Sequence, residues 1–219
     1  MVIDATRLVL VRHGQSIATV ERFAGGERGC RGLSDLGHRQ SAALAARVAR
    51  SGELDGTTLL VSSTLPRAIE TAEPLSRVLH LPVRQDRDLC EMHPGEGDGM
   101  SWDRWEERFG SFDLGAEPDR PLSPGGESWR VFARRARAAL SSLVRENPGT
   151  TVVVATHGGV IEQSMFFGTG RDDGTAPGTN LAMVVNTSLT EWRVSEGGGW
   201  QLVRYNDAAH LRPDGTPYD

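Results

Sequence analysis

The sequence predicts a three-layer α/β/α sandwich whose central sheet is mostly parallel and has an antiparallel edge. Three short runs rich in branched aliphatic residues, at 8–11, 57–62 and 151–155, are typical of buried strands. Segments with helical periodicity separate these runs, as expected when right-handed crossovers join parallel strands. A glycine-rich turn at 196–199 lies between two further strand-like segments, which predicts an antiparallel hairpin.

Length and composition indicate one globular domain that covers residues 1–219, since the chain has 219 residues and 38% of them are hydrophobic. The net charge of -5 gives no basic surface for nucleic acid. Two cysteines, Cys30 and Cys90, provide neither a disulfide framework nor a zinc-type CxxC pair. There is no signal-peptide pattern and no apolar run of membrane-spanning length. We therefore expect a cytoplasmic protein that binds neither nucleic acid nor a membrane.

The first half of the chain alternates loops and helices. A glycine-rich surface loop covers residues 23–32, and Ser34-Asp35 then caps a helix. After the second strand, Pro66 suits the first turn of another helix. Pro74 lies further into the same segment and predicts a kink or a break there.

The middle of the chain is richer in loops. Residues 89–99 form a loop of glycines and acidic side chains, and a short helix is expected at 101–109. The stretch that follows, to Pro124, is rich in turn residues. We therefore expect residues from about 92 to 124 to form a small cap or lid.

The last third returns to regular elements. A long helix is expected at 129–144, and another helix follows the third strand and runs to about Phe167. Three segments, 181–186, 188–194 and 200–205, resemble strands, and the last two form the hairpin.

Basic or imidazole side chains follow each of the three buried strands. Arg12-His13-Gly14 follows the first strand, Arg67 the second and His157-Gly158 the third. Each feature alone is weak, but the carboxyl ends of parallel strands meet at one edge of a sheet, where ligands bind. Guanidinium groups suit phosphate, and histidine can attack phosphorus at neutral pH and later release it. The sequence therefore predicts a phosphoryl-transfer site with His13 as the nucleophile.

Taken in order, these motifs resemble those of the histidine phosphatase superfamily, also called the phosphoglycerate mutase-like family. The matching segments are Arg12-His13-Gly14-Gln15-Ser16, residues 62–72 (SSTLPRAIETA), Leu89-Cys90-Glu91, Gly125-Gly126-Glu127-Ser128, Thr156-His157-Gly158-Gly159, Asn186-Thr187-Ser188, Asn206-Asp207 and His210-Leu211. The resemblance covers nearly the whole chain and implies a phosphoglycerate mutase-like fold.

The resemblance also implies a role for each matched residue. His13 would form a phosphohistidine, and Arg12, Arg67 and His157 would hold the phosphoryl oxygens. Glu91 would protonate the leaving oxygen and then activate water.

Further contacts to the phosphate are expected from Gly14, Gln15, Ser16 and Gly158. No metal or other cofactor is implied, because the arginines supply the positive charge that phosphoryl transfer needs.

The chain departs from the family pattern near the leaving group. Thr19 stands where the family often has asparagine, and Met92-His93-Pro94-Gly95 lacks the usual aromatic residue. Glu96 and Asp98 compete with Glu91 for the role of the acid.

A metal-independent phosphomonoester hydrolase is the leading interpretation, with a small phosphorylated substrate. The alternatives are a cofactor-dependent phosphoglycerate mutase and a non-catalytic, phosphate-binding regulatory module. The mutase is disfavoured because only about thirty residues separate Glu91 from Gly125 and the ending after His210 is short. The regulatory module is disfavoured because the nucleophile is present. Sugar phosphates, phosphoglycerates, nucleotides and phosphoproteins all stay open as substrates, and so does a homodimer.

Overall fold

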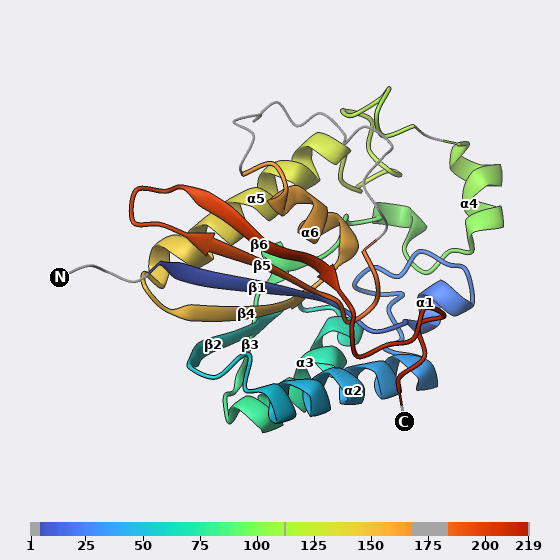
Figure 1. Ribbon diagram of the computed structural model, residues 1–219. Coiled ribbons are helices and arrows are strands. Elements are labelled where there is room, and N and C mark those ends of the chain that lie inside the picture. The colour runs from blue at the N-terminus through green and yellow to red at the C-terminus, as the bar shows by residue number, and fades with distance from the viewer. Residues whose placement is uncertain (1–4, 112, 168–183, 219) are drawn as a thin grey trace.

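Helices cover both faces of one sheet in the computed structural model, which describes residues 5–111, 113–167 and 184–218 (Figure 1). Within these residues the sheet has six strands in the order β3-β2-β4-β1-β5-β6. The strands are β1 (Thr6–Arg12), β2 (Thr57–Ser62), β3 (Val83–Gln85), β4 (Thr151–Thr156), β5 (Leu189–Val194) and β6 (Trp200–Asp207). The strands β1 to β4 run parallel, whereas β5 is antiparallel to both β1 and β6. The predicted fold class is confirmed.

The central strand β1 is buried on both faces, which explains its continuous apolar run. Leu8 and Leu10 belong to the core on one face, and Val9 and Val11 to the core on the other. All four side chains are fully buried. A strand covered on both sides shows no polar alternation.

Two helical layers complete the sandwich (Figure 1). The helices are α1 (Ile17–Val20), α2 (Asp35–Ser51), α3 (Pro66–Leu79), α4 (Trp102–Phe109), α5 (Trp129–Glu146) and α6 (Gly158–Ser164), with short 3-10 turns η1 (Arg87–Leu89) and η2 (Gly95–Gly97). The α2–α3 layer packs Leu44 and Leu75 against Val9. The α5–α6 layer packs Phe132 and Ile161 against Leu8.

Helix starts follow the predicted caps. The Ser34 hydroxyl accepts a hydrogen bond from the Gly37 N–H at 3.1 Å, and α2 ends at Gly52, whose φ is 64°. The predicted first-turn proline also holds, because α3 begins at Pro66.

Of the kink or break expected at Pro74, the break is wrong, since α3 continues through Pro74 to Leu79, and the kink stays a prediction. Ala72 and Leu75 are fully buried beside it, so tertiary packing holds the helix together across the proline. The structure also contains β3, which the sequence pattern did not predict. It is an edge strand of three residues, too short to show a period.

The strand predicted at 181–186 is wrong in its described part. Residues 184 and 185 have no regular secondary structure and Asn186 begins a turn, while 181–183 lie outside the described residues. The Val184 carbonyl accepts a hydrogen bond from Arg12, and the Val185 N–H donates to Asn206. Side chains therefore supply the hydrogen-bond partners of these backbone groups, which a neighbouring strand would supply in a sheet. The helix α6 also ends at Ser164, three residues before the expected Phe167.

Within the predicted cap at 92–124, the part around Asp98 packs against the glycine-rich loop that follows α1. The Asp98 carboxylate accepts hydrogen bonds from three backbone N–H groups of that loop, at Gly26, Arg28 and Gly29. The short helix α4 confirms the one predicted at 101–109, and its Trp105 is buried. That this region acts as a lid stays a prediction.

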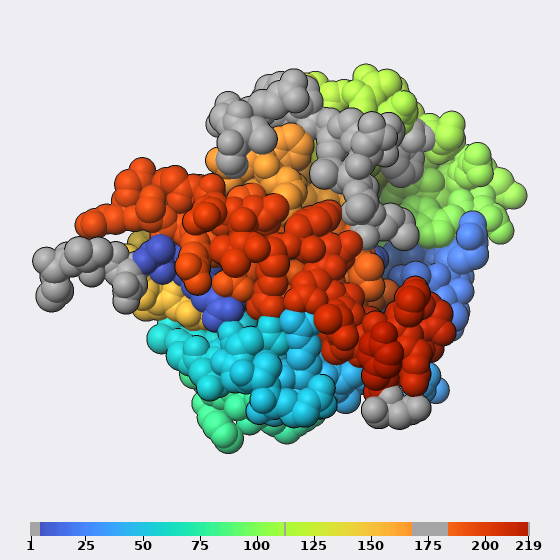
Figure 2. Space-filling view, viewed as in Figure 1, coloured from blue at the N-terminus to red at the C-terminus, as the bar shows by residue number. Residues whose placement is uncertain are grey.

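The C-terminal segment lies against α2, as the dark red atoms in Figure 2 show. The Gln40 side chain donates to the Gly215 carbonyl at 2.7 Å and accepts from the Gln15 N–H at 2.8 Å. This side chain therefore links the chain end to the loop after β1.

The N-terminus of α2 approaches the loop after β1 very closely at Gly37. A Cβ on Gly37 would lie 2.1 Å from the Gln15 carbonyl oxygen. We expect Gly37→Ala to lower the free energy of unfolding by about 1–3 kcal/mol in urea denaturation, because backbone must move to admit the methyl group. Gly197→Ala is the matched control, since a Cβ there meets nothing within 4 Å. Equal stability of the two variants would contradict this close contact.

Candidate active site

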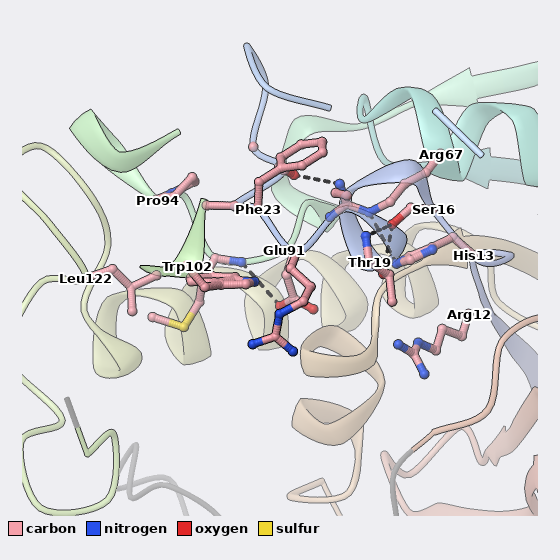
Figure 3. A pocket seen from close by; sticks show the side chains of 16 residues that line it. Arg12, His13, Ser16, Thr19, Phe23, Arg67, Glu91, Pro94, Trp102 and Leu122 are labelled. Atoms are coloured by element: carbon pink, nitrogen blue, oxygen red, sulfur yellow. Dashed lines mark hydrogen bonds between the residues drawn. The ribbon is translucent and has the colours of Figure 1, made fainter. Parts of the chain in front are cut away.

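A pocket of about 380 Å³ opens where β1 and β2 end (Figure 3). Five of the residues that line it were predicted from the sequence: Arg12, His13, Ser16, Arg67 and Glu91. The parallel strands deliver these side chains to one edge of the sheet, as expected from their order.

His13 is buried and holds a defined tautomer. Arg67 Nε donates to His13 Nε2 at 3.2 Å, and since a guanidinium only donates, Nε2 must carry the lone pair. The proton is therefore on Nδ1, which donates to the Gly14 carbonyl at 2.7 Å. Burial, then the charges of Arg67 and Arg12, lower the pKa of His13 well below its usual value. The imidazole is neutral at neutral pH, with a lone pair on Nε2.

Two guanidinium groups flank this imidazole. Arg67 lies on the first turn of α3 and is buried, with Nη1 donating to the Gly25 carbonyl at 2.6 Å. Arg12 ends β1 and donates from Nη1 to the Val184 carbonyl. Burial lowers the pKa of Arg12, while Glu91 and Glu162 act in the opposite direction. An arginine with a lowered pKa stays protonated, so the pocket keeps both positive charges.

His157 follows β4 and lies fully buried beside His13, with 5.1 Å between the ring centroids. Its Nε2 and the Ser63 hydroxyl form a hydrogen bond of 2.7 Å. Burial, then the charge of Arg67, lower the pKa of His157 well below the usual value. In the described part of the chain, His157 Nδ1 and Arg12 Nε are buried and have no hydrogen-bond partner. Such groups are rare in proteins and fit a site that receives a polar ligand.

Glu91 enters the pocket from the segment after η1, and Figure 3 shows it between Trp102 and His13. One carboxylate oxygen accepts from the Gly159 N–H at 3.0 Å, and the other from the Met92 N–H at 3.2 Å. Two backbone donors therefore orient the carboxylate.

The two competing acids are engaged elsewhere. Glu96 pairs with Arg108 at 2.9 Å on the exposed surface. Asp98 is occupied by the three backbone N–H groups described above. Glu91 is the carboxylate among the described residues that line the pocket.

The other predicted phosphate contacts take different positions. Ser16 lines the pocket, and its hydroxyl caps α1 by accepting from the Thr19 N–H at 3.2 Å. The Gln15 side chain accepts from the Ser34 hydroxyl at 2.7 Å and is not among the lining residues. Gly14 donates its N–H to Thr71 Oγ1, and Gly158 starts α6 beside Arg12.

The turn at 184–188 holds the end of β1 from behind. One peptide unit is bonded at both ends: its Val184 carbonyl accepts from Arg12, and its Val185 N–H donates to Asn206 Oδ1 at 2.6 Å. Sequence reasoning gave Asn206 no role, because the contact joins residues distant in the chain.

The same turn also bonds the backbone of Arg12 and His13. The Asn186 side chain donates to the His13 carbonyl at 2.8 Å, and the Thr187 N–H donates to the Arg12 carbonyl at 2.9 Å. Thr187 has a φ of 55°, rare for a β-branched residue, and its hydroxyl bonds His210 Nε2 at 2.8 Å. His210 thus lies behind the site and supports it.

The far side of the pocket is mostly apolar. Figure 3 places Phe23, Trp102 and Leu122 there, across from His13. Arg22 and Met92 also line the pocket. No pattern in the sequence points to Arg22.

The described residues contain neither a metal-binding cluster nor a membrane-spanning helix. They contain no group of three or more His, Cys, Asp or Glu side chains that could bind a metal ion. None of their helices is long and apolar enough to cross a membrane.

The chain is similar in sequence to proteins of one known family. Residues 8–208 match the model of the histidine phosphatase superfamily (branch 1). Phosphoglycerate mutase-like protein 4 of Arabidopsis thaliana is 29% identical over 218 residues, which cover 97% of this chain and 90% of the relative. A metal-independent phosphoserine phosphatase of the same plant is 32% identical over 165 residues, covering 72% of this chain and 66% of the relative.

A solved structure of a mycobacterial glucosyl-3-phosphoglycerate phosphatase is also similar. It has a TM-score of 0.74 and 29% sequence identity, and the match covers 92% of this chain and 99% of that one. Together with the family match, this likeness confirms the predicted phosphoglycerate mutase-like fold.

The buried side chain of His210 should make the stability of the protein depend on pH. Burial, then the charge of Arg47, lower the pKa of His210 to about 4. An unfolded histidine has a pKa of about 6.5, so between these values the unfolded chain binds a proton that the folded chain does not. Stability should therefore fall as the pH falls through this window. We expect His210→Gln, measured by urea denaturation from pH 6 to 5, to reduce this slope by about 1 kcal/mol per pH unit. An unchanged slope would contradict a neutral, buried His210.

Proposed function

Because the chain belongs to the histidine phosphatase superfamily, we propose that it hydrolyses small phosphomonoesters through a phosphohistidine on His13. One observation carries the proposal: a neutral imidazole presents the Nε2 lone pair between two guanidinium groups. The partnerless Nε donor of Arg12 supports it, since a phosphoryl oxygen is the acceptor it needs. His157 Nδ1 is a second such donor in the tautomer whose Nε2 accepts from the Ser63 hydroxyl.

In the first step, Nε2 of His13 attacks phosphorus while the ester P–O bond breaks. The Arg67 N–H that bonds Nε2 turns to a phosphoryl oxygen, which frees the lone pair. Arg12 and His157 hold the remaining oxygens. Phosphoryl transfer depends mainly on such positioning and charge neutralisation, so this set of donors is sufficient without a metal ion.

Glu91 completes the cycle as acid and then base. In its carboxylic acid form it gives its proton to the leaving oxygen, so that an alcohol departs. The resulting carboxylate takes a proton from water as that water attacks the phosphohistidine, and the N–P bond breaks to release phosphate. The hydrogen bonds from Gly159 and Met92 favour one orientation for both steps.

Metal independence is part of the proposal. Arg12 and Arg67 already bring the two positive charges that a phosphoryl dianion requires, and one relative is named a metal-independent phosphoserine phosphatase. The expected activity therefore persists in EDTA.

Loss of the nucleophile tests the covalent mechanism. We expect His13→Ala to reduce phosphate release from p-nitrophenyl phosphate in EDTA by about a thousandfold or more. His38→Ala is the matched control, because His38 is an exposed histidine on α2 away from the pocket.

Rapid quenching with radiolabelled substrate should also trap an acid-labile phosphoenzyme in the wild type and not in His13→Ala. Unchanged turnover in His13→Ala would exclude the phosphohistidine. Isomerisation of 3-phosphoglycerate without phosphate release would instead identify a mutase.

The leaving group tests the acid. Glu91→Gln should lower kcat/KM for an alkyl phosphate about a hundredfold, but that for p-nitrophenyl phosphate far less, since nitrophenolate departs without a proton. Glu96→Gln serves as the control, because that carboxylate pairs with Arg108 at the surface. Equal losses on both substrates would move the acid role away from Glu91.

A further inference from the structure

Arg22 brings a third guanidinium to the pocket. It follows α1, is exposed to solvent and lines the same pocket as Arg12 and Arg67. No side-chain hydrogen bond or ion pair of Arg22 occurs within the described residues. By contrast, neighbouring Arg31 pairs with Glu21, and Arg28 with Asp98. A cation without a partner on a ligand-binding wall is available to the ligand.

The backbone holds Arg22 in a specific conformation. Its φ is 57°, in the left-handed region that residues with a Cβ adopt rarely. The Arg22 carbonyl accepts from the Trp102 N–H at 3.0 Å, and Phe23 forms a β-bridge with Ser101. The start of α4 therefore fixes the point from which the Arg22 side chain leaves the backbone. Strained residues of this kind are concentrated at functional sites.

The charges of the pocket indicate what Arg22 would bind. A phosphoryl dianion is matched by Arg12 and Arg67, and Glu91 must stay free to exchange its proton. The positive charge of Arg22 is then not matched by the phosphoryl group, and one negative charge on the leaving group would match it. Phe23, Trp102 and Leu122 line the same pocket and offer apolar surface to the rest of the leaving group.

We propose that Arg22 forms a second anion subsite and that the substrates are phosphomonoesters whose leaving group carries a carboxylate. The proposal rests on the hydrolase function proposed above and specifies its substrate class. A single guanidinium favours a monoanionic carboxylate, which it can bind with two parallel hydrogen bonds.

Two pairs of esters differ in the carboxylate alone. They are 3-phosphoglycerate against glycerol 3-phosphate, and O-phosphoserine against phosphoethanolamine. For each pair we would measure the ratio of kcat/KM values from phosphate release in EDTA. The wild type should prefer the carboxylate in at least one pair by about tenfold or more, the usual worth of a charge-assisted hydrogen bond.

Arg22→Gln should reduce that preference about tenfold, and Arg22→Lys should retain part of it because the charge remains. Glutamine carries the same Cβ at φ 57°, so the backbone strain is matched between wild type and variant. Arg39→Gln is the control for loss of a charge, since Arg39 is exposed on α2 and does not line the pocket.

The outcomes separate the two proposals. A ratio that is the same in wild type and Arg22→Gln, while both enzymes hydrolyse p-nitrophenyl phosphate, overturns the subsite and leaves the hydrolase intact. The same loss in Arg39→Gln also overturns the subsite, because general electrostatic attraction would then explain the preference. A wild type that hydrolyses none of the esters overturns the proposed function and the subsite with it.

Discussion

The site depends on keeping one neutral histidine buried between two guanidinium groups at the end of β1. Desolvation and positive charge both oppose protonation of His13, so its lone pair is retained at neutral pH. The surrounding backbone must then be rigid, because any rotation of the ring would misplace Nε2. The His13 N–H donates to the Thr156 carbonyl of β4, while the turn at 184–188 bonds the carbonyls of Arg12 and His13 from the other side. The sheet and this turn together determine where the His13 side chain points.

A chain with a negative net charge can still form a positively charged pocket, because arginines line the pocket while most carboxylates lie elsewhere. Asp98 is bonded to backbone N–H groups, and Glu96 is paired with a surface arginine. The arginines of the pocket are less fully paired: Arg12 Nε has no partner among the described residues, and Arg22 makes no described ion pair. The pocket therefore carries excess positive charge while the net charge of the chain is -5. Charge at the site is a local property, and composition does not report it.

Where local pattern and structure disagree, a long-range contact explains the difference. Helix α3 survives Pro74 because buried neighbours pack it against the sheet. Residues 184–186 look apolar enough for a strand, yet their peptide groups bond the side chains of Arg12 and Asn206. The three residues of β3 pair with β2, although no period marks them. In each case the residue or strand that determines the local structure is distant in the sequence, beyond the roughly 11–18 residues over which a periodic pattern is read.

The amino-acid order alone was enough to place Arg12, His13, Arg67 and His157 together. Buried parallel strands end at one edge of a sheet, so residues that follow those strands must meet there whatever the loops do. Side-chain direction in the irregular segments could not be obtained in this way. Only the folded chain turns Glu91 into the pocket and Asp98 away from it, directs Gln15 toward Ser34, and adds Arg22 to the far wall. Those orientations come from hydrogen bonds between segments far apart in the chain, and such pairings leave no periodic signal in the sequence.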